Sequence, residues 1–189
     1  MRKIKMMIKK KIRIISGKLR HRNIITIENK KIKPTKNIIK ETVFNWLNNK
    51  IINSKCLDCF AGSGSLGIEA ISRNAKSVTF LEKNKKIVEN IKNNIKKLKI
   101  KNVKLIHTDT ISWLKKKNEK YDIVFIDPPF EKKLINLTSY LLEKNEWLNK
   151  KSYIYIEYKK KTKIKIPSSW FLYRKKTSGT INYSIFLKK

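Results

Sequence analysis

From about residue 55 onward, the apolar positions along the chain alternate between two periodicities. Short runs of apolar and β-branched residues predict strands, whereas longer stretches with an apolar residue every three or four positions predict helices. The predicted strands read KCLDCF, SVTFLE, NVKLIH and YDIVFID, and the predicted helices between them span residues 65–72, 84–98 and 110–116. Strands separated by helices favour a parallel, doubly wound α/β sheet with right-handed crossovers.

The C-terminal part of the chain changes this pattern. After a predicted helix over residues 133–142 come three β-rich runs, SYIYIEY, WFLYRKK and TINYSIFL, with little helical material between the last two. Two strands joined by a short connection pair in antiparallel fashion. We therefore expect a mostly parallel sheet that closes with an antiparallel hairpin at its C-terminal edge.

The N-terminal part precedes this alternation and contains a different motif. The run IRIISGKLRHRNIITI has two short β-prone segments around Ser16 and Gly17, with several cations after the turn, and predicts a basic hairpin. The run KPTKNIIKETVFNWL has apolar residues at helical spacing and predicts an amphipathic helix from Thr35 to Leu47. The chain is therefore expected to have a basic tail over residues 1–11, the hairpin and helix over residues 12–50, and a main domain over residues 51–189.

Basic residues dominate the charged positions. The chain carries 47 Lys and Arg against 14 Asp and Glu, a formal net charge of +33. Such a surplus repels itself unless a polyanion screens it, and so indicates a nucleic-acid partner. A genome rich in A and T, which enriches Lys, Ile and Asn, is a second explanation for the excess Lys, and the composition leaves both open.

The sequence has no segment that is expected to enter a membrane. The N-terminal 15 residues have cations but no apolar stretch of the roughly 7 to 15 residues found in signal peptides. Further along, no run reaches the roughly 18 apolar residues that span a bilayer. We therefore expect a soluble, unsecreted protein of the cytoplasm.

Two cysteines, Cys56 and Cys59, form a CxxC pattern of the kind found in redox and zinc sites. A second pair of ligands is missing, because His21 and His107 stand far away and singly. The surrounding run KCLDCF reads instead as a buried strand. We expect two reduced, buried thiols, as in cytoplasmic proteins, and no metal site.

A glycine-rich segment joins the first strand of the main domain to its helix. In DCFAGSGSLG, the residues Gly62, Gly64 and Gly67 have the spacing G-x-G-x-x-G, in which glycines permit a tight turn and close approach of the backbone to a ligand. The next strand ends at Glu82, 24 residues after Asp58. This is close to the roughly 20-residue separation that places an acid on the hydroxyls of a ribose. This spacing predicts a site for a nucleoside-bearing cofactor; alternatively, Glu82 is a surface acid at a strand end.

The acid Asp58, a few positions before these glycines, decides which cofactor fits. A dinucleotide places its pyrophosphate at the helix N-terminus, where a nearby carboxylate repels it. S-adenosylmethionine has no phosphate and carries an ammonium and a sulfonium that an acidic loop can receive, so it is the predicted cofactor. Asp109, after the third strand, is expected to reach the adenine amino group, to cap the following helix, or to do both. The loop residues expected to line the cofactor are Phe60, Ala61, Gly62, Ser63 and Gly64.

The strand YDIVFID ends in an acid that two prolines and an aromatic ring follow: Asp127, Pro128, Pro129 and Phe130. Ligands of open α/β sheets collect at the carboxyl ends of the strands, so Asp127 is expected beside the glycine loop. There, Asp127 and the carbonyl of Pro128 can accept the two N–H bonds of an exocyclic amine on a nucleobase, while Phe130 stacks on the base. Asp127 can also take the proton released. These residues predict an amine methyltransferase; the alternative is an Asp-Pro turn with Phe130 in the core.

Four motifs in order resemble the bacterial RsmD family of 16S rRNA guanine-N2 methyltransferases: IRIISGKLRHR, KPTKNIIKETVFNWL, CLDCFAGSGSLGIEAISR and IVFIDPPF. The resemblance covers nearly the whole chain from Ile12. It implies a Rossmann-like class I methyltransferase fold, S-adenosylmethionine as cofactor and one guanine of small-subunit rRNA as target, in an assembled or assembling 30S subunit; we expect a monomer. The resemblance also implies cofactor contacts from Thr35 and Glu41, and RNA contacts from Lys18, Arg20, His21, Arg22, Lys33 and Lys36.

The chain departs from this family in two places. Near the hairpin, members often have Trp and Gly, whereas this chain has Leu19 and His21. At the start of the helix, members often have Arg, whereas this chain has Lys. Lys keeps phosphate contacts but loses the bidentate geometry of Arg, so these departures concern RNA affinity more than chemistry. Two other functions stay open. One is a DNA adenine or cytosine amino-methyltransferase, although a chain of this length has little room for a target-recognition domain; the other is a catalytically silent RNA-binding assembly factor.

Overall fold

The computed structural model describes residues 9–27, 37–116, 119–129 and 132–189 of the chain. The N-terminal part consists of β1 (Lys9–Arg13), β2 (Asn23–Ile27), α1 (Asn37–Leu47) and the short 3₁₀ helix η1 (Asn48–Ile51). The main domain consists of β3 (Lys55–Asp58), α2 (Ser65–Ser72), β4 (Ser77–Glu82), α3 (Lys85–Leu98), β5 (Val103–His107), α4 (Thr110–Leu114), β6 (Tyr121–Ile126), α5 (Lys132–Lys144), β7 (Leu148–Lys159), β8 (Trp170–Ser178) and β9 (Ile181–Lys188).

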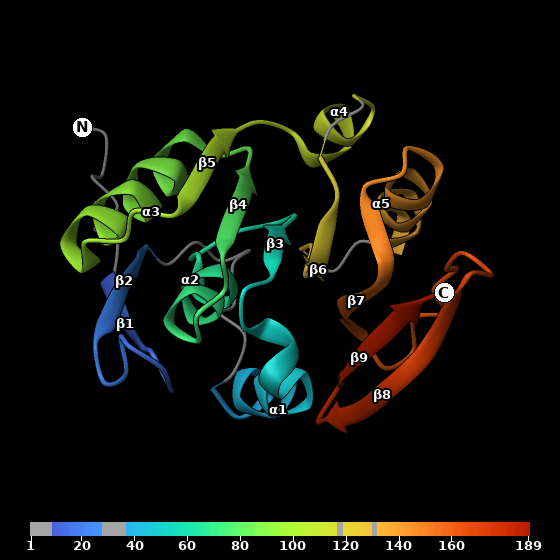
Figure 1. Cartoon of the computed structure of the whole chain (residues 1–189), viewed down its shortest axis with the longest axis horizontal. Coiled ribbons are helices and arrows are strands. Elements are labelled where there is room, and N and C mark those ends of the chain that lie inside the picture. Colours follow the sequence, from blue (N-terminus) through green and yellow to red (C-terminus); the bar gives the residue numbers. More distant parts are fainter. Residues whose placement is uncertain (1–8, 28–36, 117–118, 130–131) are drawn as a thin grey trace, which may run out of the picture.

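A seven-stranded sheet forms the centre of the molecule, in the order β5-β4-β3-β6-β7-β9-β8 (Figure 1). The strands from β5 to β7 pair in parallel, whereas β9 is antiparallel to both of its neighbours, β7 and β8. The predicted mostly parallel sheet and its antiparallel hairpin at the edge are confirmed. The hairpin joins the sheet through its second strand, because β9 lies between β7 and β8.

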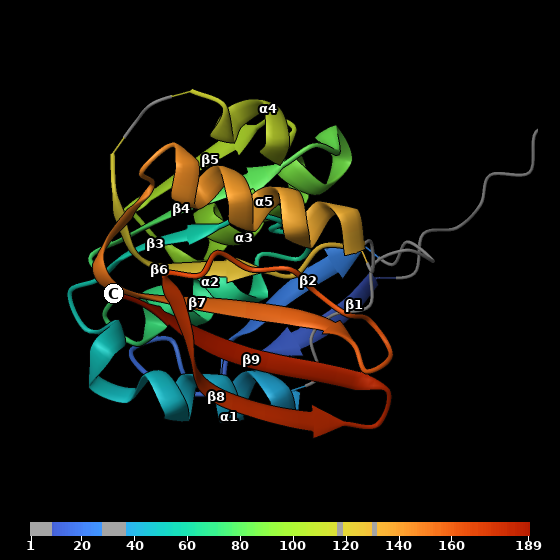
Figure 2. The ribbon, with the colours of Figure 1, turned by 90° about the vertical axis from the view of Figure 1, so that its right-hand side faces the viewer.

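Helices cover both faces of the sheet (Figure 2), and each face has its own buried core. The first core includes Phe44 of α1 and Phe125 of β6, and the second includes Trp113 of α4. Successive residues of a strand point to opposite faces, so Cys56 belongs to the first core and Leu57 to the second. The sheet is therefore doubly wound, as predicted. Among the helices of the described ranges, none is both long and apolar enough to cross a bilayer.

Both cysteines are free and buried, as the sequence predicts: Cys56 lies within β3, and Cys59 follows directly after this strand. Burial raises the pKa of the Cys56 thiol to about 12 and that of Cys59 well above its usual value. The strand expected over KCLDCF is shorter than predicted. It ends at Asp58, because the chain turns there into the glycine-rich loop.

Most other boundaries agree closely with the periodicity. The helix expected over residues 65–72 and the strand SVTFLE are confirmed to the residue. The helix α3 begins one residue later than predicted, because Asn84 is its N-cap and accepts the Lys86 N–H at 3.0 Å. The helix expected from Thr35 is described from Asn37, since its first residues lie outside the described ranges.

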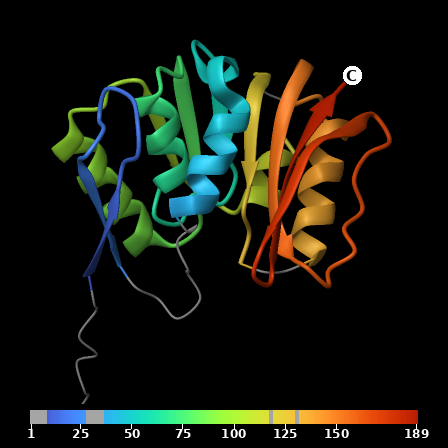
Figure 3. The same cartoon turned by 90° about the horizontal axis from the view of Figure 1, so that it is seen from below.

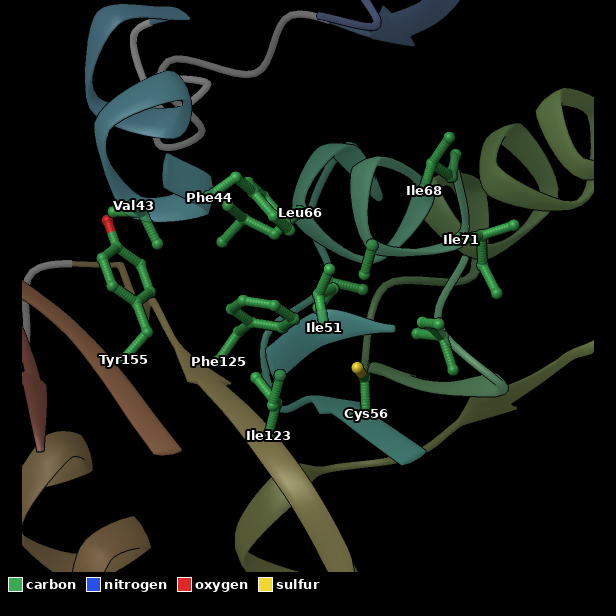
Figure 4. Close-up of a cluster of buried hydrophobic side chains, with 14 of the residues drawn as sticks. Val43, Phe44, Ile51, Cys56, Leu66, Ile68, Ile71, Ile123, Phe125 and Tyr155 are labelled. Carbon is green, nitrogen blue, oxygen red and sulfur yellow. The ribbon is translucent and has the colours of Figure 1, made fainter. Parts of the chain in front are cut away.

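Large side chains fill the space between α1 and the sheet (Figure 4). Phe44 of α1 packs on Phe125 of β6, with ring centroids 5.8 Å apart. Phe125 in turn meets the ring of Tyr155 on β7 edge-on, at 6.3 Å. These contacts hold α1 against the carboxyl halves of β6 and β7.

The predicted N-terminal hairpin is confirmed as the antiparallel pair β1 and β2, although β1 begins at Lys9, within the stretch expected to be a tail, rather than at Ile12. The hairpin packs beside α2 and α3 (Figure 3). Asn94 of α3 binds both backbone groups of Ile25: its Oδ1 accepts the N–H at 2.9 Å and its Nδ2 donates to the carbonyl at 2.8 Å. In the connecting loop, Gly17 has a φ of 81°, and an added Cβ would lie 1.8 Å from the Ser72 carbonyl oxygen. Only glycine allows this close approach of the loop to α2.

Candidate active site

The glycine-rich loop joins β3 to α2 at the carboxyl edge of the sheet. Gly62 and Gly64 have φ values of 52° and 77°, in the left-handed region that favours glycine, and Gly64 is the N-cap of α2. Gly67 lies inside α2, where an added Cβ would come within 2.2 Å of the Phe80 ring. The three glycines therefore serve the turn, the helix start and the close packing of α2 on β4.

Two carboxylates hold this loop. Asp58 is buried at the end of β3, and its Oδ2 accepts the N–H of Gly67 at 3.2 Å. Glu82, at the end of β4, accepts the N–H of Gly62 at 3.0 Å with Oε2 and the N–H of Asn84 at 2.8 Å with Oε1. Glu82 is thus an ordered acid that faces the loop rather than a surface acid. The contacts of both residues with a cofactor stay predictions.

The environment of Asp58 fits a cationic ligand. Its side chain is 2% exposed, and this burial, with a further contribution from the charge of Glu82, raises the pKa of the Asp58 carboxyl to about 7 although backbone N–H groups oppose the shift. A cation beside a buried carboxylate restores the ionised form. An ammonium-bearing cofactor therefore suits this position, and a phosphate does not.

Asp58→Asn is expected to remove a pH dependence of stability. The usual pKa of the carboxyl is 3.8, and the folded protein raises it to about 7, so the folded state holds an extra proton between these values. The free energy of unfolding should therefore fall as pH rises through this window. Each unit of pKa difference corresponds to about 1.4 kcal/mol. In urea titrations at pH 5 and pH 7.5, the wild type should lose stability relative to the variant; a difference that does not change with pH would contradict this assignment.

Asp109 caps a helix. It is the N-cap of α4, where its Oδ1 accepts the Ser112 N–H at 3.0 Å. The following residue, Thr110, donates its hydroxyl to the Cys59 carbonyl and ties α4 to the start of the glycine loop. One of the two roles that the sequence left open is thus observed, and the contact with adenine stays a prediction.

The Asp-Pro-Pro segment lies at the same edge of the sheet as the glycine loop. β6 pairs with β3 at the point where the strand order reverses, and open α/β sheets bind ligands at such switch points. Asp127, directly after β6, is partly exposed, Pro128 is buried and Pro129 is exposed. The Phe125 carbonyl accepts the Cys59 N–H at 3.0 Å and joins the end of β6 to the loop. Phe130 lies outside the described residues, so whether its ring faces a base or the core stays a prediction.

Two polar residues near this segment were not predicted from the sequence. Tyr155 of β7 donates its hydroxyl to Oε2 of Glu157 at 2.8 Å, and both side chains are buried. Burial raises the pKa of the Tyr155 phenol, and the charges of Glu157 and then Asp127 raise it further. Asp127 is therefore close enough for Tyr155 to sense its charge. The alternation in SYIYIEY places Tyr155 and Glu157 on one face of a strand, and this signal could have identified them.

The predicted RNA contacts of the hairpin lie together on the loop over residues 14–22. Lys18, Arg20, His21 and Arg22 are all exposed. Arg22 also donates to the Lys97 carbonyl of α3 at 3.2 Å. Glu41 is exposed on α1, and its cofactor contact stays a prediction. The other predicted residues of this segment, Lys33, Thr35 and Lys36, lie outside the described residues.

A buried acid on α2 anchors this loop. Glu69 accepts the N–H groups of Ile15 at 2.9 Å and Ser16 at 3.0 Å. It also pairs with Lys40 of α1 at 3.4 Å and with Arg73 at 3.0 Å. Because Glu69 is fully buried, one carboxylate holds the loop, α1 and the helix that follows the glycine loop in a fixed arrangement.

Several known proteins are similar to this chain in sequence and in fold. The family model described as conserved hypothetical protein 95 matches residues 12–187. A Buchnera aphidicola protein named ribosomal RNA small subunit methyltransferase D is 51% identical over 178 residues, which cover 94% of this chain and 93% of the relative. The protein of the same name from Escherichia coli K12 is 37% identical over 94% of this chain and 90% of its own. The solved structure of yhhF from Escherichia coli has a TM-score of 0.87 at 37% identity and covers 95% of this chain and 99% of that chain.

Proposed function

This chain belongs to the RsmD family, and we propose that it transfers a methyl group from S-adenosylmethionine to the N2 amine of one guanine in small-subunit rRNA. Its relatives are named ribosomal RNA small subunit methyltransferases, which supports rRNA methylation as the activity. The guanine amine, the assembling or assembled 30S subunit as substrate, a cytoplasmic location and a monomeric enzyme are the finer parts of the proposal.

The observation that carries the proposal is the position of Asp127 beside the glycine loop, at the switch point of the sheet. The lone pair of a nucleobase amine is delocalised into the ring, so the amine is a weak nucleophile. Asp127 and the Pro128 carbonyl accept its two N–H bonds and direct the lone pair out of the ring plane. The two prolines restrict the backbone and keep this carbonyl in place. Asp127 then takes the proton that the amine releases.

The loop and its acids suit S-adenosylmethionine, which supplies a methyl group on a sulfonium when bound. Asp58 receives the ammonium, because a buried carboxyl with a raised pKa favours a cation beside it. Each oxygen of Glu82 accepts one backbone N–H and keeps a second lone pair for a ribose hydroxyl. Asp109 caps α4 with Oδ1, which leaves Oδ2 for the adenine amine. The other residues proposed to contact the cofactor are Phe60, Ala61, Ser63, Thr35 and Glu41.

The target guanine has to be unpaired or flipped, because an amine inside a duplex cannot reach Asp127. The loop over residues 14–22 is bonded to Ser72, the last residue of α2, and its exposed cations are proposed to hold the flanking phosphates. Lys33 and Lys36 are proposed to extend this contact, and Phe130 to stack on the base.

The test supplies the purified protein with labelled S-adenosylmethionine and either small ribosomal subunits that lack its methylation or duplex DNA. Label is expected in the rRNA, and mass spectrometry should map it to N2 of a single guanine. Label found only in DNA would instead identify a DNA amino-methyltransferase. Calorimetry that detects no binding of S-adenosylmethionine would favour a silent assembly factor.

A further inference from the structure

The buried pair Tyr155 and Glu157 has no role in the chemistry described so far. Glu157 is 7% exposed, and Oε2 accepts the Tyr155 hydroxyl. Its second oxygen, Oε1, has no hydrogen-bond partner within the described ranges. The hydrogen bond from Tyr155 thus orients the carboxylate, and the described residues supply no donor to its second oxygen.

The sheet register places the two acids on neighbouring strands. β6 and β7 run parallel, with Phe125 opposite Tyr155 and Ile126 opposite Ile156. Asp127 and Glu157 each follow directly after this last pair. Alternation puts the two acids on the face of Phe125 and Tyr155, and the Tyr155 phenol senses the charge of both. Both carboxylates therefore lie at the carboxyl edge of adjacent strands, close enough to Tyr155 for each to raise its pKa.

The two acids match one nucleobase edge. Guanine presents two adjacent donors, the N2 amine and N1–H, whereas adenine and cytosine present an amine next to an unprotonated ring nitrogen, which is an acceptor. We propose that Glu157 is a specificity-determining residue whose Oε1 accepts N1–H of the target guanine while Asp127 holds the N2 amine. This inference rests on the proposed function and extends it, since it assigns the choice of base to a second carboxylate.

The surroundings of Glu157 suit this role. An ionised carboxylate accepts only and so rejects a ring nitrogen that is itself an acceptor. Burial raises the pKa of Glu157, but the hydrogen bond from Tyr155 favours the ionised form, and N1–H of guanine would favour it further. A site built around a donor on the base rejects the analogue that lacks this donor, because the acceptor is then left unpaired.

The test replaces the mapped target guanine with 2-aminopurine, which keeps the 2-amino group but has an unprotonated N1. Small subunits are reconstituted with either base, and the rate at which the wild type and Glu157→Gln methylate each of them is measured. The wild type is expected to prefer guanine by about tenfold or more in kcat/KM. In Glu157→Gln the rate on guanine should fall and the preference should approach one, because the amide can donate to N1 of 2-aminopurine.

Controls separate this inference from folding and from the proposed function. Glu119→Gln changes an exposed carboxylate before β6 and should keep the wild-type preference. Tyr155→Phe keeps the Glu157 carboxylate but removes the hydrogen bond that orients it, and should also weaken the preference. An unchanged preference in those variants that still bind S-adenosylmethionine overturns the role of Glu157. If the wild type methylates no guanine at all, the proposed function fails instead.

Discussion

Asp127→Ala is expected to lower the rate of guanine methylation by at least about a hundredfold, while calorimetry finds the affinity for S-adenosylmethionine nearly unchanged. The variant loses both the acceptor for the target amine and the acceptor for its proton. The glycine loop is untouched, because its hydrogen bonds come from Asp58 and Glu82. Single-turnover rates on small ribosomal subunits, measured beside the binding constant, check both halves of this expectation.

Asp127→Asn is the matched control. Its amide keeps an acceptor oxygen at the same place but cannot take a proton, so its activity should lie between those of the wild type and Asp127→Ala. If the alanine variant methylates rRNA at the full rate, Asp127 has no part in the chemistry. If it fails to bind the cofactor, the acid serves the binding site rather than the target amine.

Glu69→Ala is expected to lower the free energy of unfolding by about 3 to 5 kcal/mol, the range measured when one partner of a buried ion pair is removed. The variant leaves Lys40 buried without its partner, and burial already lowers the pKa of that amine although Glu69 lies beside it. The N–H groups of Ile15 and Ser16 also lose their acceptor. Urea denaturation followed by circular dichroism measures the loss.

The exposed ion pair of Lys55 and Glu119, 3.3 Å apart, provides the comparison. Glu119→Ala removes the same kind of charge from a partly solvated site and should change stability by about 0 to 1 kcal/mol. Equal effects of the two substitutions would show that the buried network contributes little. A large effect of Glu69→Ala accompanied by weaker RNA binding would show that this carboxylate also fixes the basic loop over residues 14–22.

The order of elements could be predicted from the sequence because each signal is local. The 3.6-residue period after the glycine loop defines α2, and alternation with β-branched residues defines β4. The two acids at the glycine loop followed from their spacing around the glycines. Asp127 could be placed near the loop without coordinates because ligands collect at the carboxyl ends of parallel strands.

The contacts that join distant segments could not be predicted in this way. Glu69 lies more than fifty positions from Ile15 in the sequence, and nothing in its neighbours indicates that it accepts backbone N–H groups from the hairpin loop. Glu157 reads as an ordinary polar residue in a strand until the pairing of β6 with β7 brings its strand next to the one that Asp127 follows. The insertion of β9 between β7 and β8 likewise depends on pairing between strands, which the period of one strand does not encode.

The two buried cysteines allow local unfolding on each face of the sheet to be measured separately. Cys56 packs in the core between the sheet and α1 to α3, and Cys59 in the core beneath α4 and α5. A thiol reagent reaches either sulfur only after the layer above it has separated from the sheet. The relative alkylation rates of the two thiols therefore compare how often the helices on each face separate from the sheet in the native protein, without any engineered label.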